Sequence, residues 1–507
     1  MNILPEFLLH FADKIEAKWL MFNDLKNYKS AIHQKVQMDA IRKILKSEFF
    51  DAHYYRGTYQ LKHLSDTGLA AYYLYIGFRQ DHNPSAAFSG KGYYWLRPDV
   101  RKQDLNPLMH FIDYGCREGM KPYSVSELEA LRINDDAIAE VEEMKKHGKV
   151  VLLLSHEMSL TGAPRALLNL AIILKKLGVE SVFATLTPGD LEGEVERAGL
   201  KSRILMMSGM DKDSDFAEEI KRYISSFDMI LFNTIVALPY VEYIKDLEIT
   251  KACWIHDGSY GFSCSPYISQ FANLFPLFDT IFVVGDYAKT IALSFSNYDI
   301  EMDNLIYGID DLQRDERQHE EHEGVVMVLA GTVEERKGQD ILLESLRLLK
   351  HDLLQQLRIY IIGKTINTSI YSALKDDKSG CLNILGVIPH EDVIKQFLQM
   401  DILLCPSLDD PMPIVCTEAM MLSKPVIVSD HTGTASFIHD EQNGYVVKAG
   451  NPQSLAAAIT KAIHAKNKLL QMGRRARRIF EENFTNEMFE NNVRKKILPL
   501  LSTEKSI

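Results

Sequence analysis

From about residue 148 onward, short apolar runs alternate with amphipathic segments. The runs cover residues 150–154, 181–184, 229–232, 280–284, 325–330, 358–363, 402–404 and 425–428. Continuous apolar runs of this kind predict strands buried on both faces, as in parallel sheets covered by helices. Between Pro164 and Gly178, leucines recur every three or four positions, which predicts an amphipathic helix. The pattern is therefore that of α/β domains.

A polar stretch at residues 314–323 divides the apolar runs into two series and is predicted to be an exposed linker or loop. We therefore predict two doubly wound α/β domains, at residues 146–318 and 319–507, that face each other across a cleft. The second is predicted to end in helices, the last from Phe489 to about Leu500. Ligands of such sheets bind outside the carboxyl ends of the strands, so we expect the functional site in the cleft.

Residues 1–145 differ in composition from the rest of the chain: they are rich in Tyr and His and contain a weak internal repeat. Residues 53–56 recur as 92–95, an offset of 39, and residues 73–77 recur as 111–115, an offset of 38. Two copies are too few for a free-standing solenoid. We predict a small, mainly helical accessory module with two degenerate repeats.

Composition narrows the function classes. The chain has 507 residues, 46% hydrophobic and 25% charged, which excludes disorder, collagen-like repeats and coiled coil for most of its length. A net charge of −12 argues against nucleic acid as a partner, because the phosphate backbone repels an acidic protein. The six scattered cysteines favour free thiols in a reducing compartment. With neither a signal peptide nor a spanning apolar run, we expect a cytoplasmic protein, and peripheral contact with the inner face of a membrane stays open.

Two acids carry the strongest chemical signal. Asp410 and Glu418, with seven residues between them, lie where a strand is predicted to end and a helix to begin. Backbone N–H groups near Ile414 and Val415 would point into the cleft with the positive end of the helix dipole, which favours an anion. Carboxylates also orient sugar hydroxyls well. The simpler alternative is that Asp410 caps the helix and Glu418 is a solvated acid of its first turn.

A second segment, residues 331–340, directly follows a predicted strand and contains Gly331, Arg336 and Lys337. It is not a Walker A loop, because the order glycine–lysine–serine/threonine is absent. The alternative for both cations is an exposed loop. Together with the acid pair, this segment resembles the donor-binding motifs of the retaining glycosyltransferases of family 4, or glycosyl transferases group 1. The resemblance covers about residues 148–500 and implies the GT-B fold of two Rossmann-like domains.

The resemblance also implies roles for these side chains. Asp410 would contact the transferred sugar or support charge at its anomeric carbon, although the family usually has the longer glutamate there. Glu418 would hold the ribose hydroxyls. Lys337 would bind the donor diphosphate, where a cation stabilises the leaving group. Arg336 would take the place of an arginine that many members carry where this chain has Thr332.

Three further segments resemble the family in outline. Gly162, in the first strand-to-helix turn, matches a glycine-rich turn that approaches a phosphate or the acceptor. His256, after a predicted strand, matches a histidine that contacts the transferred sugar, whereas a lone histidine is more often a buried core residue. The loop at 385–390, which contains Ile388, matches the segment that receives the nucleobase. Residues 1–145 resemble repeats fused to bacterial polysaccharide glycosyltransferases.

The resemblance predicts a hexosyltransferase-type enzyme of bacterial polysaccharide (lipopolysaccharide or capsule) or glycoconjugate synthesis. It would move a sugar from a nucleotide-diphosphate donor, such as a UDP- or GDP-sugar, to a hydroxyl of a lipid-linked or saccharide acceptor, with retention of configuration. We expect no cofactor and no metal, because the D-x-D sequence from Asp211 to Asp213 precedes a helical segment and is interpreted as a helix cap. The alternatives are a catalytically inactive binding subunit of a transferase complex, motivated by Asp410 and Thr332, and a nucleotide-sugar epimerase.

Overall fold

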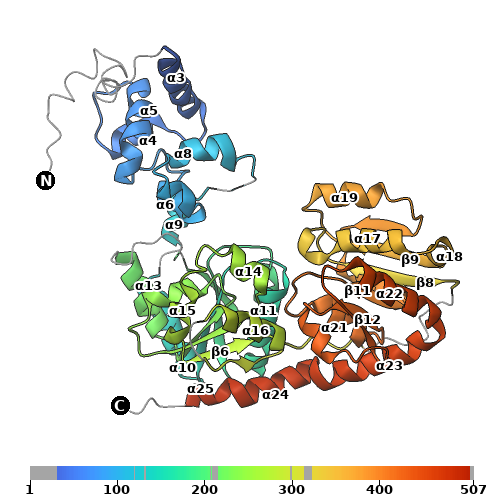
Figure 1. Ribbon diagram of the computed structural model, residues 1–507. Helices are drawn as coiled ribbons and strands as arrows, with labels where there is room; N and C mark the ends of the chain where they lie inside the picture. Colours follow the sequence, from blue (N-terminus) through green and yellow to red (C-terminus); the bar gives the residue numbers. More distant parts are fainter. Residues whose placement is uncertain are drawn as a thin grey trace. The chain divides into compact units, whose positions relative to one another are not determined.

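A computed structural model describes residues 31–502 except 119, 121, 131–132, 206, 208–214, 297–299 and 313–321. The chain divides into two compact units, residues 1–138 with 204–223 and residues 139–203 with 224–507. The second unit contains two parallel sheets, each flanked by helices (Figure 1). The expected fold class is confirmed: two doubly wound, Rossmann-like domains, preceded by a mainly helical module. The exact domain boundaries stay a prediction.

The first sheet has seven strands in the order β3-β2-β1-β4-β5-β6-β7. The strands are β1 (Val150–Ser155), β2 (Glu180–Thr185), β3 (Lys201–Ile204), β4 (Met229–Asn233), β5 (Thr250–Ile255), β6 (Thr280–Val283) and β7 (Asp303–Asn304). The helical segments among them along the chain are α11 (Gly162–Lys176), α12 (Glu192–Arg197), α13 (Asp215–Ser225), η4 (Leu238–Tyr243), α14 (Ser259–Cys264), α15 (Phe271–Leu274), η5 (Phe275–Leu277) and α16 (Asp286–Ser294). The central strand β1 pairs in parallel with both β2 and β4, and every one of its residues is buried, as in parallel sheets that helices cover on both faces.

The second sheet has six strands in the order β10-β9-β8-β11-β12-β13. The strands are β8 (Val325–Ala330), β9 (Leu357–Ile362), β10 (Leu382–Gly386), β11 (Ile402–Cys405), β12 (Val426–Ser429) and β13 (Gly444–Val447). The helical segments are η7 (Glu335–Lys337), α17 (Gln339–Leu348), α18 (His351–Leu354), α19 (Thr368–Lys375), α20 (His390–Gln399), α21 (Ile414–Met421), η8 (Gly433–Phe437), α22 (Pro452–His464), α23 (Lys466–Asn483), α24 (Asn486–Lys496) and α25 (Leu498–Ser502). Apolar side chains of β8, β9, α17 and α22 form one continuous core.

In both sheets the winding direction reverses beside the first strand of the domain. The reversal lies between β1 and β4 in the first sheet and between β8 and β11 in the second. At such a point the connecting helices diverge to opposite faces and leave a crevice at the carboxyl ends of the strands, where ligands bind. The order of strands therefore singles out the residues that directly follow β1, β4, β8 and β11.

The C-terminal helices return to the first domain. Asn169 of α11 donates to the carbonyl of Gly308 at 2.8 Å and to Oδ1 of Asn486, the first residue of α24, at 2.7 Å. The helix expected from Phe489 to about Leu500 is interrupted between α24 and α25. Pro499 has no N–H and cannot extend α24, so the chain begins a new helix there.

The helical module comprises α3 (Ala31–Lys46), α4 (Ala52–Thr58), α5 (Asp66–Tyr75), η2 (Gly77–Gln80), α6 (Gly90–Leu96), α7 (Pro98–Lys102), α8 (Pro107–His110), η3 (Phe111–Gly115) and α9 (Val125–Ala130), and α10 (Asp135–Lys145) follows. Residues 38 apart play equivalent roles in it. Asp51 and Ser89 are the N-caps of α4 and α6. The buried hydroxyls of Tyr55 and Tyr93 each pair with a histidine nitrogen at 2.9 Å. The structural offset is thus 38, and Tyr93 corresponds to Tyr55 rather than to Tyr54.

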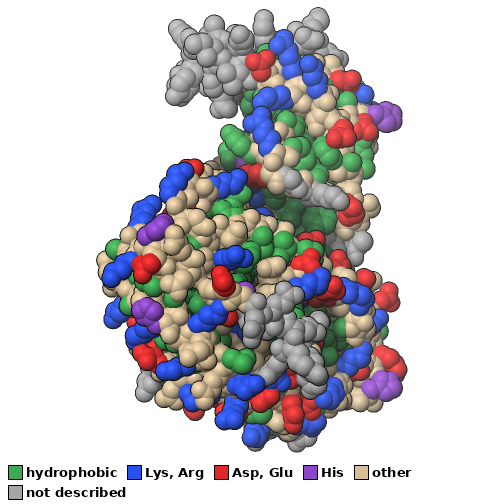
Figure 2. Space-filling view, turned by 90° about the vertical axis from the view of Figure 1, so that its right-hand side faces the viewer, with side chains coloured by type: hydrophobic (Ala, Val, Ile, Leu, Met, Phe, Trp, Pro, Cys, Tyr) green, Lys and Arg blue, Asp and Glu red, His purple; other side chains and the backbone are tan. Residues whose placement is uncertain are grey.

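On the face shown in Figure 2, Lys and Arg side chains are interspersed with Asp and Glu. None of the helices in the described ranges combines the length and apolar content that crossing a bilayer requires.

Candidate active site

Lys337 and Asp410 meet at the carboxyl ends of β8 and β11, the reversal point of the second sheet. Lys337 Nζ donates to Asp410 Oδ2 at 2.5 Å, and the two side chains are 19% and 10% exposed. Burial by itself would lower the pKa of Lys337, but the attraction of Asp410 outweighs it and raises that pKa. The lysine is therefore a charged, desolvated cation held in one place by a carboxylate.

Arg336 also belongs to this group and is not a solvated loop residue. Its Nη1 donates to the carbonyl of Asp409 at 3.0 Å and lies 4.0 Å from Asp410 Oδ2. Its Nη2 donates to Glu334 at 2.9 Å. The preceding Gly331 lies against the aliphatic stem of Lys337, where an added Cβ would come within 3.6 Å. The turn after β8 thus presents two cations to the loop after β11.

Glu418 lies inside α21 and is only 8% exposed, so it is not a solvated first-turn acid. His390 Nε2 lies 2.7 Å from Glu418 Oε1, and this hydrogen bond raises the pKa of His390 against the effect of its partial burial. His390 begins α20, directly after the loop that contains the partly buried Ile388. The structure thus joins the second acid to the expected nucleobase loop, a contact that the sequence did not indicate.

The helix-capping alternative for Asp410 is wrong. The N-cap of α21 is Pro413, which has no capping side chain, and the carboxylate of Asp410 instead binds Lys337. Ile414 and Val415 form the first turn of α21 and are partly buried. The start of this helix therefore adjoins the Lys337–Asp410 pair, as an anion site at a helix terminus would require.

Gly433 fixes the loop that carries Asp410. A Cβ at this position would lie 1.6 Å from the carbonyl oxygen of Pro411. We expect Gly433→Ala to destabilise the protein by about 2–4 kcal/mol, since the backbone must move to relieve the clash. Gly193, whose added Cβ would meet nothing within 4 Å, provides the matched control. Urea unfolding measures both variants, and equal stability of the two would contradict the expected clash.

His256 follows β5 and lies under two aromatic rings. Its ring centroid is 4.4 Å from that of Trp254 and 6.3 Å from that of Tyr307, whose hydroxyl donates to the carbonyl of Met412. Burial, with a smaller effect of His156, lowers the pKa of His256 to about 3. Its buried Nε2 has no hydrogen-bond partner among the described residues. A buried, neutral nitrogen of this kind is available to a ligand hydroxyl.

A second polar pair lies at the reversal point of the first sheet and was not predicted. His156, directly after β1, has its Nδ1 2.9 Å from Oγ1 of Thr234, directly after β4. Thr234 has a φ of 72°, a strained conformation for a β-branched residue and one that functional sites often hold. Gly162, the first residue of α11, lies nearby in the chain, and its added Cβ would be 3.5 Å from Ile414 Cδ1. The position after a strand is the one sequence signal that could have singled out His156.

We expect Asp257, the neighbour of His256, to make the stability of the protein depend on pH. Its Oδ2 accepts the N–H of Ile235 at 2.9 Å. Burial, with a smaller contribution from the charge of Asp409, raises the pKa of Asp257 to about 6. Because the folded state holds this proton up to a higher pH than the unfolded chain does, the stability from this group is present at low pH and is lost as the pH rises through about 6.

Asp257→Asn keeps an acceptor for Ile235 and removes this titration. We therefore expect the variant to gain thermal stability relative to wild type as the pH is raised from about 4.5 to about 7.5. Thermal melts at the two pH values provide the measurement. A stability difference that is the same at both would show that Asp257 does not titrate in this range.

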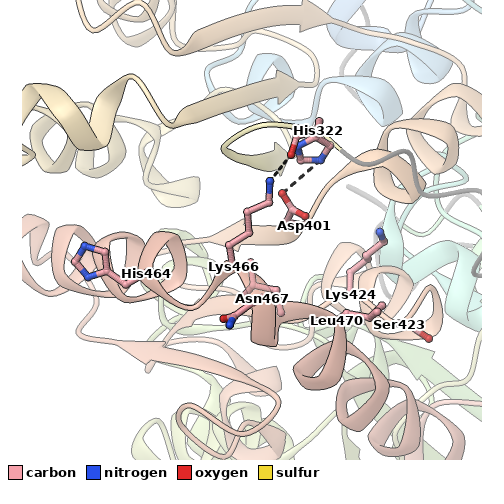
Figure 3. Close-up of a pocket in the computed structure, with 9 residues that line it drawn as sticks. His322, Asp401, Ser423, Lys424, His464, Lys466, Asn467 and Leu470 are labelled. Carbon is pink, nitrogen blue, oxygen red and sulfur yellow. Dashed lines mark hydrogen bonds and ion pairs between the residues drawn. The ribbon is translucent and has the colours of Figure 1, made fainter.

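A cavity of about 610 Å³ lies elsewhere in the second domain (Figure 3). Asp401 and Lys424, which line it, precede β11 and β12, so the cavity opens at the amino ends of the strands. Lys424 donates to the carbonyl of Leu398 at 2.8 Å, and Lys466 donates to the carbonyl of His322. The cavity thus lies at the amino ends of the strands, whereas Lys337 and Asp410 lie at the carboxyl ends. It is therefore not the ligand crevice of this sheet.

Asp211 and Asp213 form the D-x-D sequence that we interpret as a helix cap, and both lie outside the described residues. Among the residues that are described, no group of three or more His, Cys, Asp or Glu side chains could hold a metal ion.

Comparison with known proteins identifies the two domains. Residues 147–265 match the family model of glycosyl-transferase family 4, and residues 311–479 match that of glycosyl transferases group 1, together more than half of the chain. The amylovoran biosynthesis glycosyltransferase AmsK of Erwinia amylovora is 28% identical over 151 residues, 28% of this chain and 36% of that protein. The D-inositol 3-phosphate glycosyltransferase of Geodermatophilus obscurus is 26% identical over 163 residues, 30% of this chain and 36% of that protein. The matched segments thus span little more than a third of these curated relatives.

Solved structures share the fold. The Anabaena protein HepE in complex with UDP-glucose superposes with a TM-score of 0.57 at 15% identity, over 69% of this chain and 99% of that chain. A glycosyltransferase from Rickettsia africae superposes with a TM-score of 0.58 at 16% identity, over 70% of this chain and 100% of that chain. The architecture is that of GT-B glycosyltransferases, and the chain belongs to glycosyltransferase family 4, the glycosyl transferases group 1.

Proposed function

We propose that this protein transfers a sugar, of the hexose type, from a nucleotide-diphosphate donor to an acceptor hydroxyl, with retention of configuration and without a metal. The observation that carries the proposal is the juxtaposition of a buried cation and two buried acids at one reversal point. Lys337 and Asp410 form a 2.5 Å ion pair there, and Glu418 follows in the adjoining helix. Family membership supports the same reaction class.

The lysine has the capacity to bind a phosphate without giving up its carboxylate. An ammonium group carries three N–H donors, and Asp410 takes one of them. A donor diphosphate between Lys337 and the start of α21 would receive a second. Charge that develops on the leaving diphosphate is then stabilised by a fixed cation and by helix-end amides in a site with little water.

Asp410 and His256 are proposed to hold the sugar. A carboxylate next to the anomeric carbon stabilises the positive charge that builds there as the bond to phosphate breaks. His256 is neutral because burial lowers its pKa to about 3, so it offers a hydrogen bond rather than a charge. Glu418, held by His390 at 2.7 Å, is proposed to receive the ribose hydroxyls, with the base near Ile388.

Retention is proposed to come from attack by the acceptor hydroxyl on the face that the phosphate leaves. The departing phosphate oxygen accepts the proton of the acceptor hydroxyl. The acceptor oxygen thus ends in the new glycosidic bond, and the proton ends on the released nucleoside diphosphate. Without an acceptor, water takes the place of the hydroxyl. The test is ¹H NMR of the sugar released by slow donor hydrolysis. Initial release of the anomer present in the donor is expected, and initial release of the opposite anomer would contradict retention.

The biological setting remains part of the proposal. The amylovoran glycosyltransferase supports a role in bacterial polysaccharide or glycoconjugate synthesis, and the UDP-glucose bound by the Anabaena protein makes UDP-sugars the first donors to test. A lipid-linked or saccharide acceptor would place the protein in the cytoplasm, with peripheral contact at the inner face of the membrane.

The alternative is a binding subunit without activity. The tight pairing of Asp410 with Lys337 favours it, because this acid is shorter than the glutamate of the family and is already engaged. Incubation with nucleotide sugars separates the two proposals. Neither transfer nor hydrolysis, with nucleotide binding preserved, would establish the binding subunit.

A further inference from the structure

The side chain of Asp409, the neighbour of the proposed catalytic acid Asp410, binds the other α/β domain. Its carboxylate accepts the backbone N–H of Ser259 at 3.0 Å, the N–H of Tyr260 at 2.8 Å and the hydroxyl of Tyr287 at 2.7 Å. All three donors belong to the first α/β domain, whereas Asp409 follows β11 of the second. Asp409 as a residue is 6% exposed, so its carboxylate is a desolvated charge with three hydrogen bonds.

The first domain is built to receive this carboxylate. The N-cap of α14 is Gly258, which has no side chain to satisfy the first N–H groups of its helix. A Cβ on Gly258 would lie 2.1 Å from Asp409 Oδ1. Gly258 lacks the side chain that usually caps a helix, and it leaves room for the carboxylate of Asp409, which caps α14 from the other domain.

The side chains of the neighbouring acids Asp409 and Asp410 bind different domains. The side chain of Asp409 binds the first domain, while its carbonyl accepts from Arg336 at 3.0 Å. The side chain of Asp410 binds Lys337 of the second domain at 2.5 Å. The peptide unit between Asp409 and Asp410 therefore connects the contact between the domains to the two cations of the proposed donor site.

We propose that Asp409 is a positioning residue that clasps the two α/β domains in the closed arrangement and thereby sets the Asp410 carboxylate for the transfer reaction. Its significance for catalysis rests on the proposed function, whereas the clasp itself does not. The proposed contacts with the nucleotide, from Lys337, Glu418 and the loop at Ile388, lie within the second domain, so loss of the clasp leaves nucleotide binding intact. The chemical step suffers, because it needs both domains around the sugar.

The direct test is hydrogen exchange of the Ser259 and Tyr260 amides in the full-length protein. We expect both to exchange at least tenfold faster in Asp409→Asn and in Gly258→Ala than in wild type. The control is Asp228→Asn, which removes a carboxylate that accepts the N–H of Val150 at 2.8 Å, at the amino end of the central strand β1. Unchanged exchange in Asp409→Asn would overturn the clasp. If that variant does not fold, Tyr287→Phe removes one of the three bonds and is expected to show a smaller acceleration in the same direction.

A double-mutant comparison separates a clasp from two unrelated defects. Because Asp409 and Gly258 act on one contact from two domains, the double variant is expected to exchange no faster than the faster single variant. Additive effects would overturn the proposal.

The catalytic part is tested with whichever nucleotide sugar the wild type hydrolyses. Asp409→Asn and Gly258→Ala are expected to lower kcat at least fivefold per folded molecule and to change the affinity for the nucleoside diphosphate less than twofold. A purely structural residue would reduce only the fraction of folded protein, so an unchanged kcat would refute the positioning role. If the wild type turns over no nucleotide sugar, the proposed function fails, and the exchange measurements still decide the clasp.

Discussion

Replacement of Lys337 by alanine is expected to lower kcat/KM for the donor at least tenfold, about 1.4 kcal/mol of transition-state stabilisation. Lys337 is the cation proposed to bind the departing diphosphate, its side chain is 19% exposed, and no water-exposed side chain can replace a fixed charge there. Steady-state release of nucleotide from the donor provides the measurement. The matched control is Lys378→Ala, because Lys378 is an exposed lysine of the same domain.

Stability must be separated from catalysis in this experiment. Without Lys337, the carboxylate of Asp410, which is 10% exposed, loses its hydrogen-bonded cation and keeps only the more distant Arg336, at 4.0 Å. An unpaired buried charge can destabilise a protein by about 3–5 kcal/mol. The double variant Lys337→Ala with Asp410→Asn removes that charge, so it is expected to recover stability and to remain inactive. Activity of the double variant at the wild-type level would refute the role of both residues.

Replacement of Glu418 by alanine is expected to weaken donor binding at least tenfold and to act mainly on KM. A buried carboxylate that accepts two ribose hydroxyls makes the same contacts in the ground state and in the transition state, so its loss affects binding uniformly. Glu418→Gln keeps the shape and should lose less, since the amide retains one acceptor oxygen. Glu391→Ala, at an exposed acid beside His390, is the control. A fall in kcat without any rise in KM would place Glu418 at the reacting centre instead.

The sequence predicted the inner strands well and the edge strands poorly. Runs such as 150–154 and 402–404 are apolar throughout because their strands are covered on both faces. The strands β3 and β10 lie at sheet edges, and all their residues are exposed or only partly buried. A short, half-covered strand has no continuous apolar run, so its pattern does not stand out from a loop.

The donor side of the site was predictable because its chemistry is local in the sequence. Asp410 and Glu418 stand on one loop and helix, and Lys337 lies in the turn after β8, so the short motifs that resemble the family contain all three residues. The contact between the domains was not predictable in this way. Asp409 meets Ser259 and Tyr260 across about 150 residues of chain, and only the folded arrangement of two domains brings them together.

The same reasoning applies to the polar pair of the first sheet. His156 and Thr234 are 78 residues apart, and neither belongs to a motif with a fixed spacing. The order of strands brings them together, because β1 and β4 are neighbours at the reversal point. The sequence predicted each strand but contained no signal for which of them would be adjacent.

Lys337 is proposed to bind the phosphates, and Glu418 the ribose, of a single nucleotide. Calorimetric titration of wild type, Lys337→Ala and Glu418→Ala with UDP, GDP, ADP and the corresponding nucleosides tests it most directly. We predict that wild type binds one of the diphosphates and that each variant binds it at least tenfold more weakly. For the matching nucleoside, we predict weaker binding by Glu418→Ala and unchanged binding by Lys337→Ala. Equal affinity of all three proteins for every diphosphate would contradict the account.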